Sequence, residues 1–305
     1  MSPGLTRAPS VTTEWAPAKV NLYLHIGAPG AGGLHPLDSL VMFADTRAAD
    51  RVSARVFPQL ALNVEGPNSK LLKNAPHNLT LAAAMALRDA CDRTGLGAEL
   101  TLHKVLPIAG GVGGGSSDAA ATLQLLNRMW GIEFGQAALE RLANQLGSDV
   151  PACVRGRPLV MRGTGERLLD VAAPDLPVVL VNPGIPLETR KVFERFDQLG
   201  ANRTFRETHP PVADDLNAFV MQLAGFHNDL EAAATALCPE IGKALAAVRA
   251  EPGSMLARMS GSGPTCFGVF ETDAAAETAA RSIAAKKRRY WVRATTLRGA
   301  SYAGD

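Results

Sequence analysis

The sequence predicts an α+β protein built from two layered units. A chain of 305 residues is long enough for about two domains and a sizeable buried core. Segments with strand periodicity and segments with helical periodicity are mixed along the chain in an order that suits this fold class. Apolar residues make up 47% of the chain and charged residues 20%, as in an ordinary globular protein. No internal repeat or low-complexity segment is present in the sequence.

The first part of the chain, residues 1–170, is expected to form an N-terminal domain. Within residues 15–26, Val20, Leu22 and Leu24 fall on one face of a strand, and Lys19 and Asn21 fall on the other. A sharp turn is expected at residues 148–151. The other expected elements are strands at 34–44, 50–64, 98–106 and 159–168, and helices at 78–90, 116–130 and 134–146.

The second part, residues 171–305, is expected to form a C-terminal domain. A short apolar strand at 178–181 leads into an Asn-Pro-Gly turn and then into a helical stretch that contains Val192, Phe193 and Phe196. Further helices are expected at 216–223, 229–238, 241–250 and 274–285, and further strands at 254–259, 265–270 and 290–297.

Charge and cysteine content limit the classes of function. The formal net charge is +2, so nothing favours a nucleic-acid partner. The basic run at 286–289 ends an alanine-rich helical pattern, where cations suit the helix C-terminus, and we interpret it as a solvated helix end. The four cysteines are scattered, as free thiols in a reducing compartment would be. No apolar run is long enough for a signal peptide or a membrane span, and a cytoplasmic protein is expected.

A glycine-rich loop at residues 107–121 is the strongest functional signal. Five of the six residues from Gly110 to Gly115 are glycine, and Ser116, Ser117 and an aspartate follow directly. Glycine reaches positive φ and lacks a Cβ, so successive N–H groups can turn towards an anion. A helix that begins near Ser116 adds its unpaired N–H groups and its positive dipole end. The loop therefore predicts a phosphate-binding site, with a flexible surface loop as the alternative.

Two known phosphate-binding motifs fit this loop poorly. A P-loop requires a lysine and a serine or threonine after its last glycine, and no lysine lies in or just after this loop. The dinucleotide pattern can begin at Gly111 and Gly113, but Ser116 takes the place of its third glycine. A nicotinamide or flavin enzyme is therefore only weakly allowed.

For several polar residues, the neighbouring sequence allows two interpretations. Lys19 and Asn21 could point into a site or form a solvated strand face. Asp149 stands next to an apolar stretch, where a carboxylate can have a shifted pKa, but a capping or turn aspartate is an equal alternative. The turn at 260–264 (SGSGP) could be a tight hairpin only, or it could place N–H groups beside the glycine loop.

Three separated motifs together resemble the GHMP small-molecule kinases. They are the stretches 17–22 (PAKVNL), 107–121 and 260–264, supported by 35–39 (HPLDS), 147–151 (GSDVP) and 182–184 (NPG). The variants present here resemble most those members whose acceptor alcohol carries cytidine diphosphate. The resemblance covers nearly the whole chain. It implies an N-terminal domain like the second domain of ribosomal protein S5 and a ferredoxin-like C-terminal domain.

The resemblance also implies roles for individual residues. Lys19 and Asp149 would be catalytic, with Asp149 accepting the proton of the acceptor hydroxyl. Asn21, His35, Phe193, Gly261 and Gly263 would bind the acceptor, with His35 reading the cytosine edge and Phe193 stacking on the base. Mg²⁺ would accompany ATP, with Ser117 as a candidate ligand. The residues expected at the ATP site are Asn78, Lys104, Pro107, Gly110, Gly111, Gly113, Gly114, Gly115, Ser116 and Ser117.

The sequence departs from the family pattern at one position, and three alternative functions stay open. The family often has Gly-Tyr-His where this chain has Gly33, Leu34 and His35, so one aromatic partner for the cytosine is missing. Another GHMP kinase, acting on homoserine or a mevalonate-type substrate, is the nearest alternative. A non-catalytic nucleotide-binding module and a dinucleotide oxidoreductase are the others. No membrane or nucleic-acid partner is expected, and the chain is expected to be a monomer or a weak homodimer.

Overall fold

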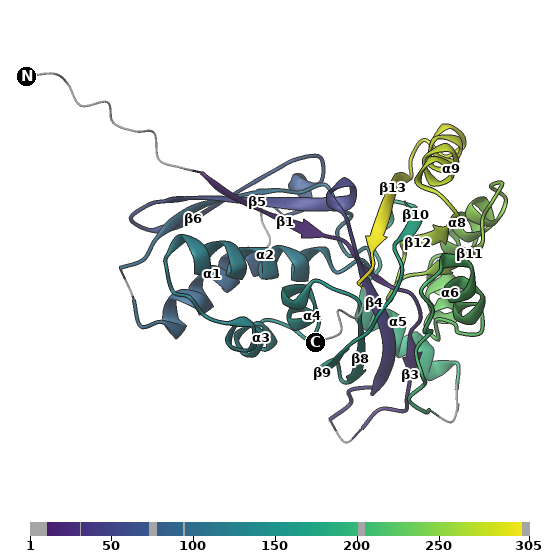
Figure 1. The fold of residues 1–305 in the computed structure, drawn as a ribbon, viewed down its shortest axis with the longest axis horizontal. Helices are drawn as coiled ribbons and strands as arrows, with labels where there is room; N and C mark the ends of the chain where they lie inside the picture. The colour runs from purple at the N-terminus through teal and green to yellow at the C-terminus, as the bar shows by residue number, and fades with distance from the viewer. Residues whose placement is uncertain (1–10, 31, 73–77, 94, 201–204, 301–305) are drawn as a thin grey trace, which may run out of the picture. The chain divides into compact units, whose positions relative to one another are not determined.

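The computed structural model divides the chain into two compact units that interleave along the sequence (Figure 1). It describes all residues except 1–10, 31, 73–77, 94, 201–204 and 301–305. Unit 1 comprises Met1–Ala16, Asp50–Val105 and Gly115–Val154, and unit 2 comprises Pro17–Ala49, Leu106–Gly114 and Arg155–Asp305. In the described part of the chain, no helix is long and apolar enough to cross a membrane.

Unit 1 contains a four-stranded sheet with helices packed along it. The strand order is β1-β5-β7-β6, with β7 antiparallel to β5 and parallel to β6. The strands are β1 (Thr12–Pro17), β5 (Ala49–Val56), β6 (Leu60–Glu65) and β7 (Ala98–His103). The helices are α1 (Leu79–Ala90), α2 (Gly114–Met129), α3 (Gln136–Asn144) and α4 (Val150–Arg155), with the short 3₁₀ turn η2 (Ser69–Leu71).

The core of unit 1 is formed by apolar residues at alternate positions of its strands and by small side chains on its helices. Along β7, Ala98, Leu100 and Leu102 are buried while the intervening residues are partly exposed, as period-2 patterning requires. On α2, Leu123 and Leu126 are fully buried together with a run of alanines, which allow neighbouring elements to approach closely. The helix at 78–90 and the helix of the glycine loop were both predicted by this pattern and are confirmed.

Unit 2 is built on a nine-stranded sheet. Seven strands follow the order β11-β12-β10-β13-β4-β8-β9, and β2 and β3 both pair with β4. The strands are β2 (Lys19–Asn21), β3 (His25–Ile26), β4 (Leu37–Ala44), β8 (Leu159–Gly163), β9 (Arg167–Asp170), β10 (Leu176–Asn182), β11 (Leu256–Met259), β12 (Cys266–Val269) and β13 (Trp291–Arg298). The helices are α5 (Thr189–Gln198), α6 (Leu216–Leu223), α7 (Glu231–Leu237), α8 (Glu240–Arg249) and α9 (Asp273–Lys286), with the 3₁₀ turn η1 (Thr46–Ala48).

Strand β10 is apolar throughout because both of its faces are covered. Val179 and Val181 belong to a core cluster shared with α5, α7, α8 and α9. Val178 and Leu180 belong to a second cluster, which includes Phe219 of α6 and residues of β2 and β4. A central strand with two buried faces reads as a continuous hydrophobic run, and residues 178–181 have that pattern.

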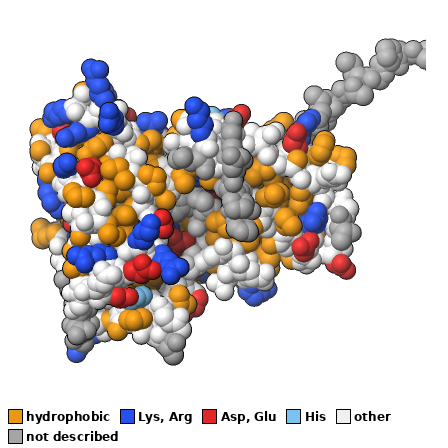
Figure 2. All heavy atoms as spheres, turned by 180° about the vertical axis from the view of Figure 1, so that it is seen from behind, with side chains coloured by type: hydrophobic (Ala, Val, Ile, Leu, Met, Phe, Trp, Pro, Cys, Tyr) orange, Lys and Arg blue, Asp and Glu red, His pale blue; other side chains and the backbone are white. Residues whose placement is uncertain are grey.

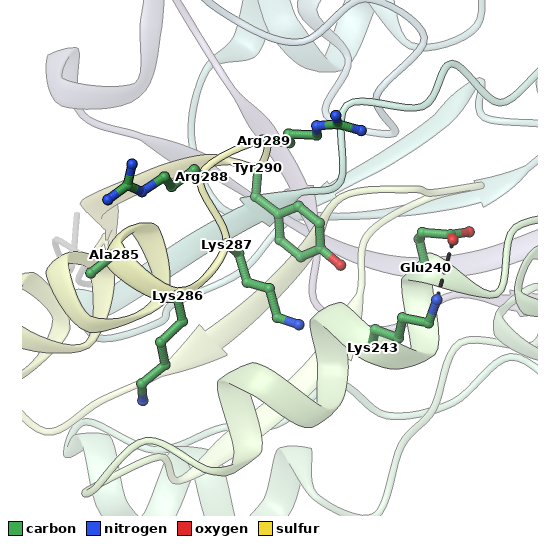
Figure 3. A pocket seen from close by; sticks show the side chains of 8 residues that line it. All are labelled: Glu240, Lys243, Ala285, Lys286, Lys287, Arg288, Arg289 and Tyr290. Atoms are coloured by element: carbon green, nitrogen blue, oxygen red, sulfur yellow. Dashed lines mark hydrogen bonds and ion pairs between the residues drawn. The ribbon is translucent and has the colours of Figure 1, made fainter.

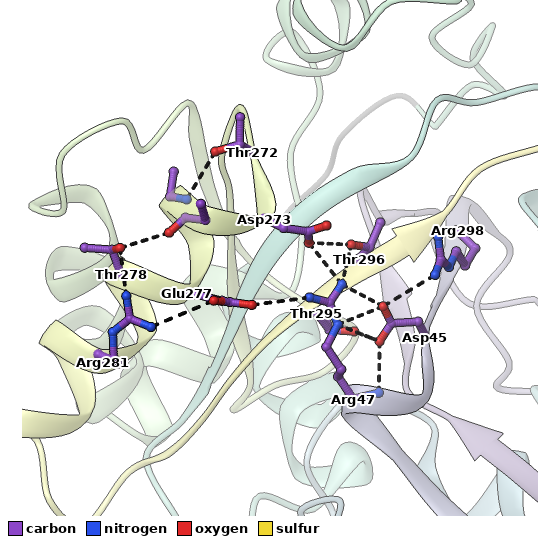
Figure 4. A network of polar contacts seen from close by, with 12 residues as sticks. Asp45, Arg47, Thr272, Asp273, Glu277, Thr278, Arg281, Thr295, Thr296 and Arg298 are labelled. Carbon is purple, nitrogen blue, oxygen red and sulfur yellow. Dashed lines mark hydrogen bonds and ion pairs between the residues drawn. The ribbon is translucent and has the colours of Figure 1, made fainter.

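A polar network joins η1 to β13 and α9 within unit 2 (Figure 4). Arg47 Nη2 donates to Asp45 Oδ2 at 2.7 Å, to Asp273 Oδ1 at 3.0 Å and to Thr296 Oγ1 at 2.6 Å. Thr295 Oγ1 donates to the other oxygen of Asp45 at 2.8 Å. Burial acts to raise the pKa of Asp45, but the hydrogen bonds from Arg47 outweigh it and the pKa is lowered.

The contacts between residues do not separate the chain into one unit before residue 170 and another after it. The segment Pro17–Ala49 belongs to unit 2 because β4 pairs with β8 on one edge and with β13 on the other. The two compact units therefore do not coincide with residues 1–170 and 171–305. That these two ranges are the N-terminal and C-terminal domains of the family stays a prediction. The sharp turn expected at 148–151 is confirmed for residues 148 and 149 and is wrong for the rest, since α4 begins at Val150.

Candidate active site

The glycine loop of unit 2 lies against the second glycine turn, and glycine is required there. Gly111 has φ +72° and Gly113 has φ +61°, both in the left-handed region. A Cβ on Gly111 would lie 2.5 Å from the carbonyl oxygen of Ser260 and 2.7 Å from that of Gly263. No side chain fits at this position, so the loop can approach the turn at 260–264 only as bare backbone.

The serine of the second turn fastens the two glycine segments together. Ser260 Oγ donates to the carbonyl oxygen of Gly111 at 2.9 Å and accepts from the backbone N–H of Asn21 at 3.1 Å. The N–H of Thr265 donates to the carbonyl oxygen of Gly110 at 3.1 Å. The turn therefore lies beside the glycine loop, which was the second of its two sequence readings. Ser260 was not itself singled out, although its place in the SGSGP motif could have indicated it.

Lys19 and Asn21 are buried rather than part of a solvated strand face. Lys19 is 4% exposed, its N–H donates to the carbonyl oxygen of Val112 at 2.9 Å, and its side chain packs on Gly113. Asn21 is 5% exposed, and its Nδ2 donates to Ser39 Oγ at 2.8 Å. Both residues of this predicted pair thus lie at the glycine loop and its supporting turn.

The turn after β10 supports the same region. Asn182 Nδ2 donates to Thr265 Oγ1 at 2.8 Å, and Asn182 Oδ1 accepts from the N–H of Gly184 at 2.7 Å. Because Thr265 also bonds to Gly110, one asparagine connects this turn to the glycine loop. The NPG motif is visible in the sequence, but this role of Asn182 is not, because its partner residue lies 83 positions away.

His35 and Phe193 are brought together in unit 2, as the resemblance implies for a base-binding pair. Their ring centroids are 5.1 Å apart at an interplanar angle of 40°. His35 Nδ1 lies 2.8 Å from the carbonyl oxygen of Gly27, which can only accept, so Nδ1 carries the proton of the neutral ring. His35 Nε2 lies 3.4 Å from Asp197 on α5. Leu34, at the position of the missing tyrosine, is 64% exposed.

Unit 1 holds the helix that follows the glycine loop. Helix α2 begins at Gly114, so the N–H groups of Gly114, Gly115 and Ser116 have no carbonyl of a preceding helical turn to bond to. Ser117 is 2% exposed, and its Oγ lies 3.4 Å from Cys153 Sγ of α4. Ser116 is partly exposed. A phosphate at this helix start would meet N–H donors and the positive end of the helix dipole.

Asp149 stands immediately before α4 in unit 1. Its carbonyl oxygen accepts from the N–H of Cys153 at 3.2 Å, the first hydrogen bond of the helical pattern. The residue is partly buried, and the helix that follows is almost entirely buried. The backbone of Asp149 therefore occupies the capping position that was one of its two sequence readings.

Lys104 has an environment that the sequence did not reveal. It is 2% exposed, and its Nζ lies 2.6 Å from both Asp50 Oδ2 and Asp118 Oδ2. Burial acts to lower the pKa of Lys104, but the two carboxylates outweigh it and raise the pKa. Burial, supported by the charge of Asp50, raises the pKa of Asp118 to about 7 even though Lys104 opposes the shift.

This buried cluster was missed because charged residues in a strand or helix pattern usually face water. The available signal in the sequence was an aspartate close after the glycine loop, near the start of an alanine-rich helical pattern. The ammonium of Lys104 is paired with both carboxylates. Asn78 caps α1, and its Oδ1 accepts a hydrogen bond from the N–H of Thr80 at 2.9 Å. Roles for these two residues near the nucleotide stay predictions.

A magnesium site made by protein alone is not present in the described part of the chain, where no three His, Cys, Asp or Glu side chains gather to hold a metal. Mg²⁺ that accompanies a nucleotide needs only one or two protein ligands. The hydroxyl of Ser117 at the start of α2 is chemically suited to be one of them.

Two family models match the chain. The model of the GHMP kinases N terminal domain matches residues 78–157, and the model of the GHMP kinases C terminal region matches residues 214–288. A 4-diphosphocytidyl-2-C-methyl-D-erythritol kinase from Hyphomonas neptunium is 46% identical over 297 residues, which cover 96% of this chain and 99% of that protein. A relative with the same name from Cereibacter sphaeroides is 45% identical and covers 92% of this chain and 98% of its own length.

Solved structures agree with these sequence matches. The crystal structure of a 4-(cytidine 5'-diphospho)-2C-methyl-D-erythritol kinase matches with a TM-score of 0.72 at 31% identity, covering 94% of this chain and all of that one. Mevalonate kinase from L. major matches with a TM-score of 0.72 at 14% identity and shows the shared fold alone. The predicted α+β fold of the GHMP kinases is confirmed. The chain belongs to the 4-diphosphocytidyl-2-C-methyl-D-erythritol kinases, small-molecule kinases of the GHMP family.

Proposed function

We propose that this chain transfers the γ-phosphoryl group of ATP to the 2-hydroxyl of 4-diphosphocytidyl-2-C-methyl-D-erythritol. The products are the 2-phosphate and ADP, in the non-mevalonate route to isoprenoid precursors. Relatives that carry this substrate in their name are about 45% identical over nearly their full length. The observation that supports the substrate most directly is the contact between His35 and Phe193.

The pair of rings suits a pyrimidine. An aromatic face contributes about 1–3 kcal/mol when it stacks on a nucleic-acid base. The Nδ1 proton of His35 is held by the carbonyl of Gly27, which fixes the ring orientation and leaves Nε2 for a polar partner. The bare Nε2 of the neutral ring can only accept, which suits the amino group of cytosine. Asp197 Oδ2 lies 3.4 Å from Nε2 and would pair with it only if the ring were protonated. Homoserine and mevalonate have no base, so this arrangement favours the cytidine substrate over the nearest alternatives.

We assign the phosphates of ATP to the glycine loop and the start of α2. The loop leads directly into α2, whose first turn presents backbone N–H groups and the positive end of the helix dipole. Mg²⁺ supplies charge neutralisation of the phosphates when it is bound, and Ser117 is the residue proposed to hold it. Phosphoryl transfer asks a protein chiefly for positioning and charge stabilisation, which these backbone donors provide.

Asp149 is proposed as the base and Lys19 as the cation of the reaction. The acceptor hydroxyl loses its proton to the carboxylate of Asp149 as its oxygen bonds to the γ-phosphorus and the bond to ADP breaks. The ammonium of Lys19 stabilises negative charge that builds up on the transferred group. Lys19 is buried beside Gly113, so its charge acts in a poorly solvated environment where it counts for more than in water.

The substrate is tested by measuring ADP release with Mg-ATP and a panel of alcohols. The panel contains the cytidyl-methylerythritol compound, homoserine and mevalonate at equal concentration. We expect kcat/KM for the cytidyl compound to exceed the others by several orders of magnitude. Turnover of another alcohol without turnover of the cytidyl compound would overturn the proposal. The monomeric or weakly dimeric state and the cytoplasmic location expected from the sequence stay predictions.

A further inference from the structure

A basic hollow lies in unit 2 between the end of α9 and the start of α8 (Figure 3). Its volume is about 460 Å³. Residues 285–290 line one side of it, and Glu240 and Lys243 line the other. Five of its eight lining residues are lysine or arginine, and only Glu240 is acidic. On the face drawn in Figure 2, lysine and arginine side chains also gather over the end of the molecule that holds α9.

Among the described residues, carboxylates pair with two of the five cations of this hollow. Lys243 Nζ lies 3.3 Å from Glu240 Oε1, and Lys286 Nζ lies 3.0 Å from the buried Glu251. Lys287, Arg288 and Arg289 form no ion pair with any carboxylate of the described residues. Lys287 Nζ instead stands 6.0 Å from the ring centroid of Tyr290. In Figure 3, Arg288 and Arg289 extend to different sides of that ring.

A helix C-terminus explains only part of this arrangement. The negative end of the α9 dipole favours cations near the end of the helix, where Lys286 lies in the last turn and Lys287 is the C-cap residue. Arg288 and Arg289 come after the helix has ended, where the dipole effect has largely fallen away. Both are exposed arginines on the rim of the hollow, and in Figure 3 their guanidinium groups point to opposite sides of it. A guanidinium group can bind an anion with several oxygens through two hydrogen bonds.

We propose that this hollow binds a small oligophosphate anion, a diphosphate group that is either free or esterified to a small organic molecule. A volume of about 460 Å³ lies in the range of small-molecule sites, whereas a nucleic acid would need a longer basic surface. The net charge of the chain is only +2, so general attraction of anions does not account for such a local excess. All of the lining residues lie outside the glycine loop and the His35 and Phe193 pair.

The test is a calorimetric titration of inorganic pyrophosphate into the whole protein, saturated beforehand with a non-hydrolysable ATP analogue. The analogue occupies the nucleotide site, so the heat reports any other site. We expect binding that weakens as salt is raised, since exposed charges are screened. The triple variant Lys287→Gln, Arg288→Gln, Arg289→Gln should bind pyrophosphate at least about tenfold more weakly, because three charge-assisted contacts are lost.

A matched variant controls for net charge. Arg93→Gln, Arg141→Gln and Arg157→Gln remove the same charge from exposed positions elsewhere and should leave pyrophosphate binding unchanged. Methyl diphosphate serves as the esterified probe, and tighter binding of either compound identifies the source of the ligand. Equal weakening in both triple variants, or no binding of either compound to the saturated wild type, would overturn the proposal. Kinase turnover should be the same in both variants, which separates this proposal from that of the phosphoryl-transfer function.

Discussion

Single side chains of unit 2 hold the glycine loop in place. Ser260 bonds both to Gly111 and to Asn21, and Asn182 bonds through Thr265 to the segment that contains Gly110. The bonds from Asn21 N–H to Ser260 and from Asn182 to Thr265 are buried, and the bond from Ser260 to Gly111 is partly buried. Loss of one partner of a buried hydrogen bond leaves the other unsatisfied at a cost of about 1–3 kcal/mol. The loop is therefore held ready for its ligand rather than ordered by it.

Replacing Asp149 by asparagine tests the proposed base. The amide has nearly the same size but cannot accept a proton, so kcat should fall by about 100-fold or more while KM for ATP changes little. Steady-state kinetics at saturating acceptor measure both constants. Asp92→Asn is the control, since Asp92 is exposed and its φ of 51° suits asparagine. A near-normal kcat in Asp149→Asn would remove this residue from the mechanism.

Replacing Phe193 by alanine tests the base-binding pair. Loss of a stacking contact worth about 1–3 kcal/mol should raise KM for the cytidyl acceptor about tenfold, with KM for ATP unchanged. Leu199→Ala, at the C-cap of the same helix and 46% exposed, should change neither constant. If the constant for ATP rose and that for the acceptor did not, the assignment of Phe193 would be wrong.

At the scale of elements, the start of α2 is tied to the sheet of unit 1 by buried charge. Lys104 follows β7, Asp50 lies on β5, and Asp118 lies in the first two turns of α2. A buried ammonium shared by two carboxylates fixes where this helix begins relative to two strands. The net stabilisation from such a cluster is small, because desolvation of the buried charges offsets much of their attraction.

The pH dependence of stability tests this cluster. The pKa of Asp118 is about 7 in the fold, against about 4 in an unfolded chain. Between these values the folded state holds a proton that the unfolded state has released, so stability is lost as pH rises from about 4 to about 7. Asp118→Asn removes that titration, and its Tm should fall less than that of the wild type between pH 5 and pH 8. Asp89→Asn, an exposed aspartate of α1, should behave like the wild type. An unchanged dependence in Asp118→Asn would contradict the raised pKa.

The polar network around Arg47 is expected to stabilise the packing of η1 against β13 and α9. Arg47→Met removes the donor that links η1 to β13 and α9, and should lower the free energy of unfolding by about 1–3 kcal/mol at pH 7. The pKa of Asp273 is lowered by Thr296 and Arg47, and that of Asp45 is also lowered, so the stabilisation is present above about pH 4 and is lost as pH falls through the folded values.

Denaturant unfolding at pH 7 and pH 3 measures this effect. The difference between the wild type and Arg47→Met should shrink at pH 3, where the carboxylates are protonated. Arg190→Met breaks an exposed pair with Glu194 and should cost less than about 0.5 kcal/mol at either pH. A loss in Arg47→Met that is as small as in Arg190→Met would show that the network does not stabilise the fold.

At the scale of the whole molecule, the chain crosses between its two units several times. Local patterns were enough for most elements, because periodicity and capping act within one helix or strand. They predicted the helix after the glycine loop and the buried strand β10. They could not predict that residues 17–49 pair with β8 and β13, since partners so far apart in sequence leave no local signal. The short helix α4 was missed because Pro151 near its start reads as a turn.

The candidate site, too, could be predicted from the sequence only where the signal is local. The glycine loop could be recognised alone, but His35 and Phe193 were joined only through the family resemblance, and the structure places their rings in contact. The cluster of Lys104, Asp50 and Asp118 escaped notice because a charged residue in a periodic pattern looks like a solvent-facing one. Buried polar partners are decided by tertiary structure, and that information is absent from local patterns.

The proposed reaction is tested most directly by phosphorus NMR of the product. The protein is incubated with Mg-ATP and 4-diphosphocytidyl-2-C-methyl-D-erythritol, and the spectrum is followed with time. We predict a new phosphomonoester signal coupled to the carbon that bears the 2-hydroxyl, rising in step with ADP. A spectrum in which ATP is consumed without that signal, or in which the phosphate appears on another hydroxyl, would contradict it.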